Sequence, residues 1–223
     1  MNKFNLCFMA LVLACLTTHA QIMHDLQGKP YMEQAYTEVD GNPLLINNWV
    51  EGAIDFVNGK TVKVKVKYDL VKDVLLFQNK SDTTAMYFIE PVKGFTLNNA
   101  FINESNILPL VFNSGYPAID AQTPASFYQI IAPGKMQLLR HYRKAIRTDQ
   151  AFNSATVTKT FAYTDFYYLY ADNKIIRIKP SQKSILAAMA NKSTEIQAYL
   201  KNNTVDYKND AALAKLFNYY NSL

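Results

Sequence analysis

A strict alternation of valine and lysine in the segment NGKTVKVKVKYDLVKDVLLF, residues 58–77, most constrains how this chain can fold. Successive side chains of a β-strand point to opposite faces of the sheet, so the alternation predicts a strand with one buried and one solvated face. A turn and a second, more apolar strand, Val74–Phe77, complete the segment. The pattern therefore predicts an antiparallel sheet that packs one face on a core.

The preceding strand, Trp49–Val57, determines the register of this hairpin. A two-residue loop would place Ile54 opposite Lys63 and mix apolar with charged side chains on both faces. A three-residue loop, Val57–Gly59 with left-handed backbone at Gly59, instead aligns residues of one kind on each face. The pairs that it predicts are Ile54 with Val62, Val50 with Val66 and Glu51 with Lys65.

This register turns one row of side chains toward the core and another toward water. The inward row is Val62, Val64, Val66 and Tyr68, and the outward row is Lys63, Lys65 and Lys67. Charged outward side chains keep a sheet face soluble and discourage edge pairing, which is the interpretation we favour. An anionic partner lying along the lysines is the alternative.

Further strands are predicted where β-branched and aromatic residues cluster between turn formers. Besides Thr61–Tyr68 they are Met86–Ile89, Gly94–Ile102, Leu108–Phe112, Phe127–Ala132, Met136–Tyr142, Thr156–Tyr170 and Lys174–Ile178. The short links between the first strands leave no room for crossover helices and predict an antiparallel meander. A polar break at Thr148–Ser154 is expected to interrupt the strands, and the turn-rich segment Asn113–Pro124 to form the longest loop.

The period of the apolar residues changes after Pro180 and predicts helices. Their expected starts are Ser181, then Ser193 or Thr194, then Asn209 or Asp210. The last helix carries a single apolar stripe of Leu213, Leu216, Phe217 and Tyr220. The predicted fold class is α+β: a predominantly antiparallel β meander, as a curved sheet or half-barrel, with short C-terminal amphipathic helices that pack on the sheet.

The first 20 residues have the layout of a signal peptide. Lys3 precedes a short apolar run, and Thr18–Ala20 offers the small residues of a cleavage site. We therefore expect export to the periplasm or cell surface, with a lipid anchor at Cys15 as the less favoured alternative. No later apolar stretch reaches the roughly 20 residues of a membrane-spanning helix, so no transmembrane segment is expected in the mature chain.

The remaining chain is predicted to be one domain, residues 21–223. Its parts are an N-terminal lead-in segment over 21–48, the antiparallel β region over 49–179 and the helices over 180–223. About 200 residues, nearly half of them hydrophobic, can bury a core that is stable without disulfides.

Few chemically reactive residues follow the leader. Cys7 and Cys15 both lie within it, and the histidines after Ala20 are His24 and His141. The sequence contains no zinc-ligand cluster, phosphate-binding loop, dinucleotide fingerprint or nucleophile elbow. We expect no metal, no cofactor and no identifiable catalytic residue, and an enzymatic role is the minority interpretation. Without Lys3 the net charge is about +4, too small and dispersed to indicate a nucleic-acid partner.

Five residues are candidates for a ligand-binding site. Tyr163, Asp165 and Tyr167 lie in the aromatic strand, where burial can raise the pKa of the carboxyl group. Arg140 and Arg143 can bind a phosphate or carboxylate through their guanidinium groups. The alternatives are core packing for the aromatic rings and ordinary surface charge for the arginines, because a strand points these two arginines to opposite faces.

Three segments resemble a family of uncharacterised secreted proteins of Gram-negative bacteria. They are GNPLLINNWVEGAIDFVNGKTVKVKVKYDLVKDVLLF, FYQIIAPGKMQLLRHYRK and KSILAAMANKSTEIQAYLKNNTVDYKNDAALAKLFNYYNSL. The resemblance implies an exported bacterial protein without a known activity. It carries no catalytic or binding residues that can be transferred to this chain.

These observations favour an exported, non-enzymatic envelope protein with a binding or structural role. Its expected partner is another envelope protein, a lipid or a glycan. A carrier that holds an apolar or lipidic ligand between sheet and helices is one alternative, and it requires an apolar cavity. A hydrolase of envelope polysaccharide that uses two carboxylates is another, and it requires two facing acids in an open cleft. The sequence leaves the oligomeric state open.

Overall fold

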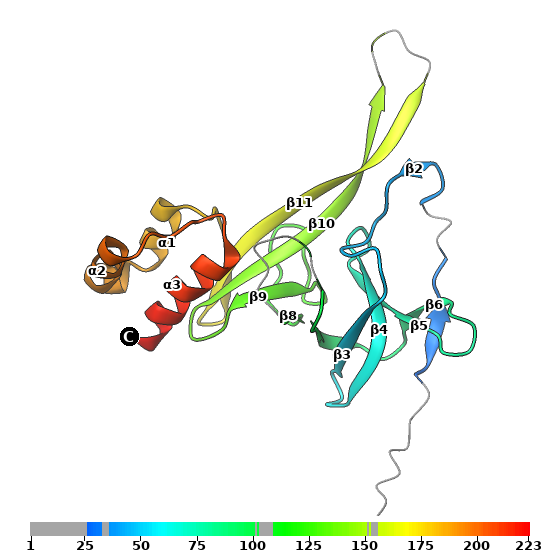
Figure 1. The fold of residues 1–223 in the computed structure, drawn as a ribbon, viewed down its shortest axis with the longest axis horizontal. Helices are drawn as coiled ribbons and strands as arrows, with labels where there is room; N and C mark the ends of the chain where they lie inside the picture. Colours follow the sequence, from blue (N-terminus) through cyan, green and yellow to red (C-terminus); the bar gives the residue numbers. More distant parts are fainter. Residues whose placement is uncertain (1–25, 33–35, 101, 103–108, 151, 153–155) are drawn as a thin grey trace, which may run out of the picture.

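The computed structural model describes residues 26–32, 36–100, 102, 109–150, 152 and 156–223. The predicted signal peptide, both cysteines and His24 lie outside the described residues. Within the described residues, strands form one open, curved and mostly antiparallel sheet, followed by three α-helices at the C-terminal end (Figure 1). This architecture confirms the predicted fold class.

From β3 onward the strands and α-helices follow the predicted order along the chain, whereas no strand was predicted where β1 and β2 lie. The strands are β1 Gly28–Pro30, β2 Val39–Asp40, β3 Val50–Phe56, β4 Thr61–Asp69, β5 Val74–Gln78, β6 Ala85–Phe88, β7 Val92–Leu97, β8 Leu110–Asn113, β9 Tyr128–Ala132, β10 Gln137–Gln150, β11 Val157–Ala171 and β12 Lys174–Ile178. The helices are α1 Gln182–Ala188, the short 3₁₀ helix η2 Ala190–Lys192, α2 Ser193–Asn202 and α3 Asp210–Ser222.

The strand order shows where the meander ends. Neighbouring strands run β1-β6-β5-β4-β3-β7-β8-β9-β10-β11-β12, so β3 to β6 form the predicted antiparallel meander. β7 does not continue on β6 but returns to the other side of β3, and the later strands extend the sheet from there. β2 joins the far part of the sheet by pairing in parallel with β11. The lead-in segment therefore contributes strands to two parts of the sheet that are far apart in the strand order.

The β3–β4 hairpin has the predicted register. Ile54 lies opposite Val62, Val50 opposite Val66, and Glu51 opposite Lys65. Gly59 has a φ of 86° and closes the three-residue loop, in which Phe56 N donates to Lys60 O at 2.9 Å. The inward row is buried or half-buried and the lysines lie on the other face, where the ammonium group of Lys67 sits 4.9 Å from the centre of the Trp49 ring.

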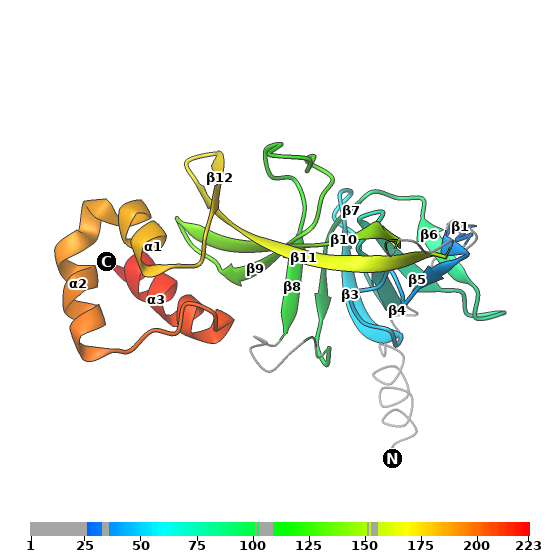
Figure 2. The ribbon, with the colours of Figure 1, turned by 90° about the horizontal axis from the view of Figure 1, so that it is seen from above.

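β10 is longer than predicted, because it continues to Gln150 instead of ending at Tyr142. The polar residues Thr148–Gln150 do not break the strand but pair with Val157–Lys159. The prediction of a break was wrong there because ladder hydrogen bonds hold an exposed strand together whatever the polarity of its side chains. β10 and β11 begin beside the helices and span much of the molecule's length (Figure 2), and their far ends rise away from the other strands of the sheet (Figure 1).

Among the described residues, buried apolar side chains form three clusters. The first occupies the curved part formed by β3–β8, where the rings of Tyr68, Phe95 and Phe112 contact one another. The second lies between the helices and one face of β9–β11, and the third lies on the opposite face of the same strands. We call the first two the half-barrel core and the helix core.

The helices begin where their capping residues predict. Ser181 accepts a hydrogen bond from Ser184 N at 3.4 Å, and Asn209 accepts one from Ala212 N at 3.0 Å. α2 begins at Ser193, as predicted, without a side-chain cap. Among the described residues no helix combines the length and the apolar character that crossing a bilayer requires.

Candidate functional site

The candidate site lies on the face of β9–β11 that carries the helices. Arg140 on β10 stands opposite Tyr167 on β11 and Gln129 on β9, while Tyr142 stands opposite Asp165. Cross-strand partners share a face of a sheet, as do residues two apart on one strand. Five side chains from three strands are therefore brought together.

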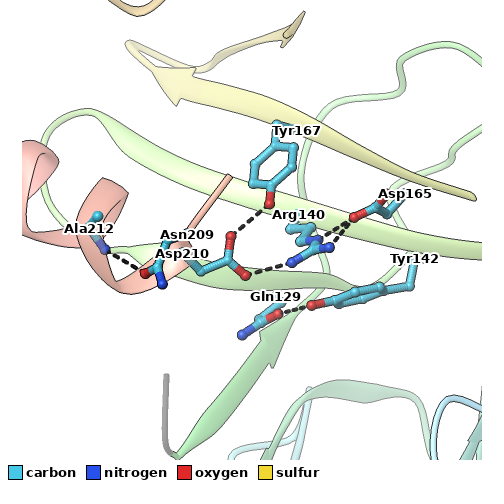
Figure 3. Close-up of polar contacts among 8 residues, drawn as sticks. All are labelled: Gln129, Arg140, Tyr142, Asp165, Tyr167, Asn209, Asp210 and Ala212. Atoms are coloured by element: carbon cyan, nitrogen blue, oxygen red, sulfur yellow. Dashed lines mark hydrogen bonds and ion pairs between the residues drawn. The ribbon is translucent and has the colours of Figure 1, made fainter. Parts of the chain in front are cut away.

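A sixth residue, Asp210, reaches this face from the first turn of α3 (Figure 3). Arg140 Nη1 donates to Asp210 Oδ2 at 2.6 Å, and Arg140 Nε donates to Asp165 Oδ2 at 2.5 Å. Arg140 Nη2 also forms an ion pair with Asp165, and the hydroxyl of Tyr167 donates to Asp210 Oδ1 at 2.7 Å. We call Arg140, Tyr142, Asp165, Tyr167 and Asp210 the Arg140 cluster.

These contacts are important for stability because the charged groups that make them are largely buried. The side chains of Asp210 and Arg140 are 3% and 11% exposed, whereas Asp165 is 26% exposed at the edge of the cluster. A buried carboxylate is stable only when it is paired and hydrogen-bonded. Asp210 has a cation, a tyrosine hydroxyl and the positive N-terminal end of α3 as partners.

The environment determines the protonation states of Arg140 and Tyr167. Burial alone lowers the pKa of Arg140, but its interactions with Tyr142 and Asp210 outweigh burial and raise it above the ordinary value. Burial raises the pKa of Tyr167 far above 10, and the charge of Asp210 adds to this effect. At neutral pH the guanidinium is therefore charged and the Tyr167 hydroxyl keeps its proton for the bond to Asp210.

Arg140 also connects two apolar cores. Its guanidinium carbon lies 5.0 Å from the centre of the Tyr142 ring and 5.1 Å from that of Tyr167. Tyr142 belongs to the half-barrel core and Tyr167 to the helix core. The hydroxyl of Tyr142 donates to Gln129, which fixes that ring from the side of β9. The polar side chains of the cluster therefore link the half-barrel core to the helix core.

The structure brings together four of the five predicted site residues: Arg140, Asp165 and Tyr167 lie within the cluster, and Tyr163 lies at its edge. Tyr163 is 45% exposed, and the centre of its ring lies 6.4 Å from that of Tyr142. Desolvation, followed by the charge of Asp165, raises the pKa of Tyr163 to about 12. Arg143 is exposed and lies on the opposite face, as strand alternation predicts, so it does not join the cluster.

The sequence analysis missed Asp210 and Gln129 as members of the site. Asp210 is adjacent to Asn209, and both were named only as alternative starts of a helix. A buried carboxylate in the first turn of a helix requires a cation as its partner. The sequence does not show which one, because Arg140 is 70 residues away along the chain. Only the packing of α3 on the sheet identifies that cation.

A second buried carboxylate, Asp69, has a similar set of partners. The hydroxyls of Tyr31 and Tyr36 donate to Asp69 Oδ2 at 2.9 and 2.8 Å. The backbone N–H groups of Val71 and Lys72 donate to its other oxygen at 2.8 and 3.0 Å. These contacts fasten the N-terminal segment to the end of β4, so this carboxylate has a structural role.

The described pockets lie away from the Arg140 cluster. The larger one is an open cleft of about 470 Å³ at the end of the helices, with lining residues that include Lys135, Lys192, Tyr220 and Asn221. Much of its polar lining is used internally, because Asn221 bonds to the β9–β10 turn and Lys192 Nζ donates to Tyr220 O at 3.1 Å. In the described ranges there is no group of three or more potential metal-binding side chains.

Comparison with protein-family models, with curated proteins and with solved structures found no match to this chain. The two carboxylates of the Arg140 cluster share one guanidinium. Both carboxylates are therefore paired with a cation. Because two negative charges face the single positive charge of the guanidinium, that charge is already neutralised and does not favour an external anion.

Proposed function

We propose that this chain is an exported, non-enzymatic protein of the bacterial cell envelope with a binding role. One observation carries the non-enzymatic part: Asp165 and Asp210 are both bound to Arg140. General acid–base chemistry needs carboxyl groups that can meet a substrate and exchange a proton with it. In this protein Asp210 instead joins α3 to the sheet, and Asp165 joins β11 to β10 through the same arginine.

The binding role is supported by the projecting end of the β10–β11 hairpin. We call residues 143–150 and 157–164 the arm. Three apolar side chains of the arm are strongly exposed, since Ile146, Val157 and Tyr163 are 42%, 50% and 45% accessible. All three lie on one face of the hairpin. Exposed apolar residues gathered on a protruding element indicate an interaction surface.

The two alternatives have less support. A lipid carrier needs an apolar cavity between sheet and helices, but that space is filled by buried side chains such as Met189, Leu216 and Phe217. A carboxylate-dependent hydrolase needs two facing acids in an open cleft. Asp165 and Asp210 face one arginine, and neither lines the 470 Å³ cleft.

Photocrosslinking in intact cells of the producing bacterium tests the binding role. A photoreactive residue at Val157 is compared with one at Lys183, an exposed position on α1. We expect a discrete crosslinked product from Val157 and none from Lys183. Equal labelling from both positions, or no product, would contradict a binding role for the arm.

A second measurement tests the two alternatives. Native mass spectrometry of the mature protein from its own envelope is expected to show the bare chain mass. An extra mass that denaturation removes would favour the carrier. Release of sugar fragments from envelope polysaccharide, abolished by Asp165→Asn in a folded variant, would overturn the non-enzymatic proposal.

A further inference from the structure

The arm presents an unpaired strand edge. β9 pairs with β10 only at Leu138–Arg140, whereas the β10–β11 ladder continues ten residues further to Gln150. In the described part of the chain no strand pairs with Ala145–Asp149 on the edge of β10 that faces away from β11. A two-stranded ribbon is marginally stable in water, and an open edge is a template for another strand.

The backbone shows which residues offer their hydrogen-bonding groups at this edge. Lys144 N points away from β11, because it donates to Leu70 O at 3.1 Å. In an antiparallel strand, alternate residues present both N–H and C=O to the same neighbour. Ile146 and Thr148 therefore direct their backbone donors and acceptors outward. Lys144 marks the inner limit of the open edge, since Leu70 already occupies its N–H.

The charged side chains along this edge would complement those of a second copy of the same edge. Arg147 and Asp149 flank Thr148, lie on one face of the arm, and are 67% and 51% exposed. Within the chain Arg147 Nη2 lies 2.9 Å from Asp149 Oδ1. If two such edges pair antiparallel about Thr148, each Arg147 stands opposite Asp149 of the second copy. A shift that centres the pairing on either neighbour would set like charges opposite each other, which is unfavourable.

We infer that the outer edge of β10 pairs with the same edge of a second copy of this chain, with the two-fold axis at Thr148. The inference rests on the proposed binding role and specifies the partner of the arm. The two Thr148 residues form a hydrogen-bonded pair, and the two Arg147–Asp149 pairs occupy the closer, non-hydrogen-bonded positions. The contact is isologous, so it closes after two copies.

The opposite edge of the arm is less suited to this pairing. β2 already pairs with Lys159 and Thr160 of β11, and the ring of Tyr36 lies 5.5 Å from that of Phe161. Pairing at the β10 edge instead joins two ribbons into a four-stranded sheet. The joined edge is short, so the dimer is weak and depends on concentration.

Analytical ultracentrifugation of the purified chain without its leader, over a range of concentrations, tests the inference. We expect a monomer–dimer equilibrium whose dissociation constant rises about tenfold or more in Arg147→Asp, because two attractive pairs become repulsive. Asp149→Arg should weaken the dimer similarly. The double variant R147D/D149R restores opposite charges across the two-fold axis and should restore the dimer.

Thr148→Pro provides a second test that does not depend on charge. Proline is tolerated where a strand N–H points away from its neighbour, so the β10–β11 ladder should persist while the outward donor is lost. We expect this variant to be monomeric with an unchanged circular dichroism spectrum. A monomer at every concentration, or a dimer that neither Arg147→Asp nor Thr148→Pro weakens, would overturn the inference. Crosslinking of Val157 to another envelope component, with a monomeric purified protein, would overturn the self-pairing and leave the binding role intact.

Discussion

At the scale of single residues, Arg140 supplies the positive charge that stabilises the buried carboxylate of Asp210. Removing Asp210 from water is costly, and the attraction to a nearby guanidinium offsets that cost only with good geometry and further hydrogen bonds. Both conditions hold, because Tyr167 supplies a second donor and α3 supplies its N-terminal dipole. The arginine in turn has partners for three of its nitrogen atoms.

Replacing Arg140 by methionine should therefore destabilise the protein strongly. The variant Arg140→Met keeps most of the side-chain volume but leaves Asp210 as a buried charge without its cation. Breaking a buried ion pair from one side costs roughly 3–5 kcal/mol. Urea unfolding followed by circular dichroism measures the loss.

Arg143→Met is the matched control for that variant. Arg143 lies on the same strand, three residues away, but its side chain is exposed on the opposite face. Exposed substitutions of this kind change stability by about 0.5 kcal/mol or less. Equal losses in the two variants would show that Arg140 contributes only surface charge.

The left-handed backbone of Gly59 leads to a second prediction at the residue scale. Its φ of 86° is a left-handed conformation, and an added Cβ would meet no atom within 4 Å. Gly59→Ala should therefore cost about 1 kcal/mol through backbone strain alone. Gly59→Asn should cost less, since asparagine tolerates this conformation. Thermal unfolding of both variants compares them, and equal stability of Gly59→Ala and the natural chain would show that the loop adopts another conformation.

At the scale of elements, local patterns determined what could be predicted. The register of the β3–β4 hairpin followed from alternation, because a slip of one residue would turn Val64 and Val66 into water. The starts of α1 and α3 followed from capping residues for the same local reason. The expected break at Thr148 failed because polarity is a poor guide in an exposed ribbon, where backbone bonds to Lys159 and its neighbours maintain the strand.

The α3 cap gives a prediction at this scale. The side chain of Asn209 accepts a hydrogen bond from Ala212 N and so satisfies one of the free N–H groups at the helix start. Asn209→Ala should lower the free energy of unfolding by about 1 kcal/mol, whereas Asn209→Ser should retain most of it. Chemical denaturation of both variants measures the difference. If serine were no better than alanine, the cap would contribute nothing and packing alone would hold α3.

At the scale of the whole molecule, the site could be predicted only in part. The sequence placed Asp165 and Tyr167 in one aromatic strand, and strand spacing separated Arg140 from Arg143. Asp210 was beyond reach, because its contact with Arg140 depends on how α3 folds back over the sheet. The return of β7 to β3 was also beyond reach, since the lengths of the links permit either neighbour.

The same scale determines how the protein responds to alkali. Burial raises the pKa of many tyrosines, to about 12 for Tyr116. The shift is larger for Tyr31, Tyr68, Tyr142 and Tyr167. An unfolded tyrosine titrates near 10, so above that pH the native state binds more protons than the unfolded state. This contribution to stability is therefore complete below pH 10 and is lost as the pH rises toward 12 and beyond.

We expect the urea midpoint to fall steadily above pH 10, and the ionisation of these buried tyrosines, followed as tyrosinate absorbance at 295 nm, to coincide with unfolding. Lys144 acts in the opposite direction, because burial lowers its pKa and stability from this group rises with pH up to about 10.5. It is one group against many tyrosines, so the fall should dominate. Tyrosinate that forms near pH 10 while the urea midpoint stays constant would mean that these hydroxyls are open to water. The packing that joins the two cores through Tyr142 and Tyr167 would then be looser than the structure shows.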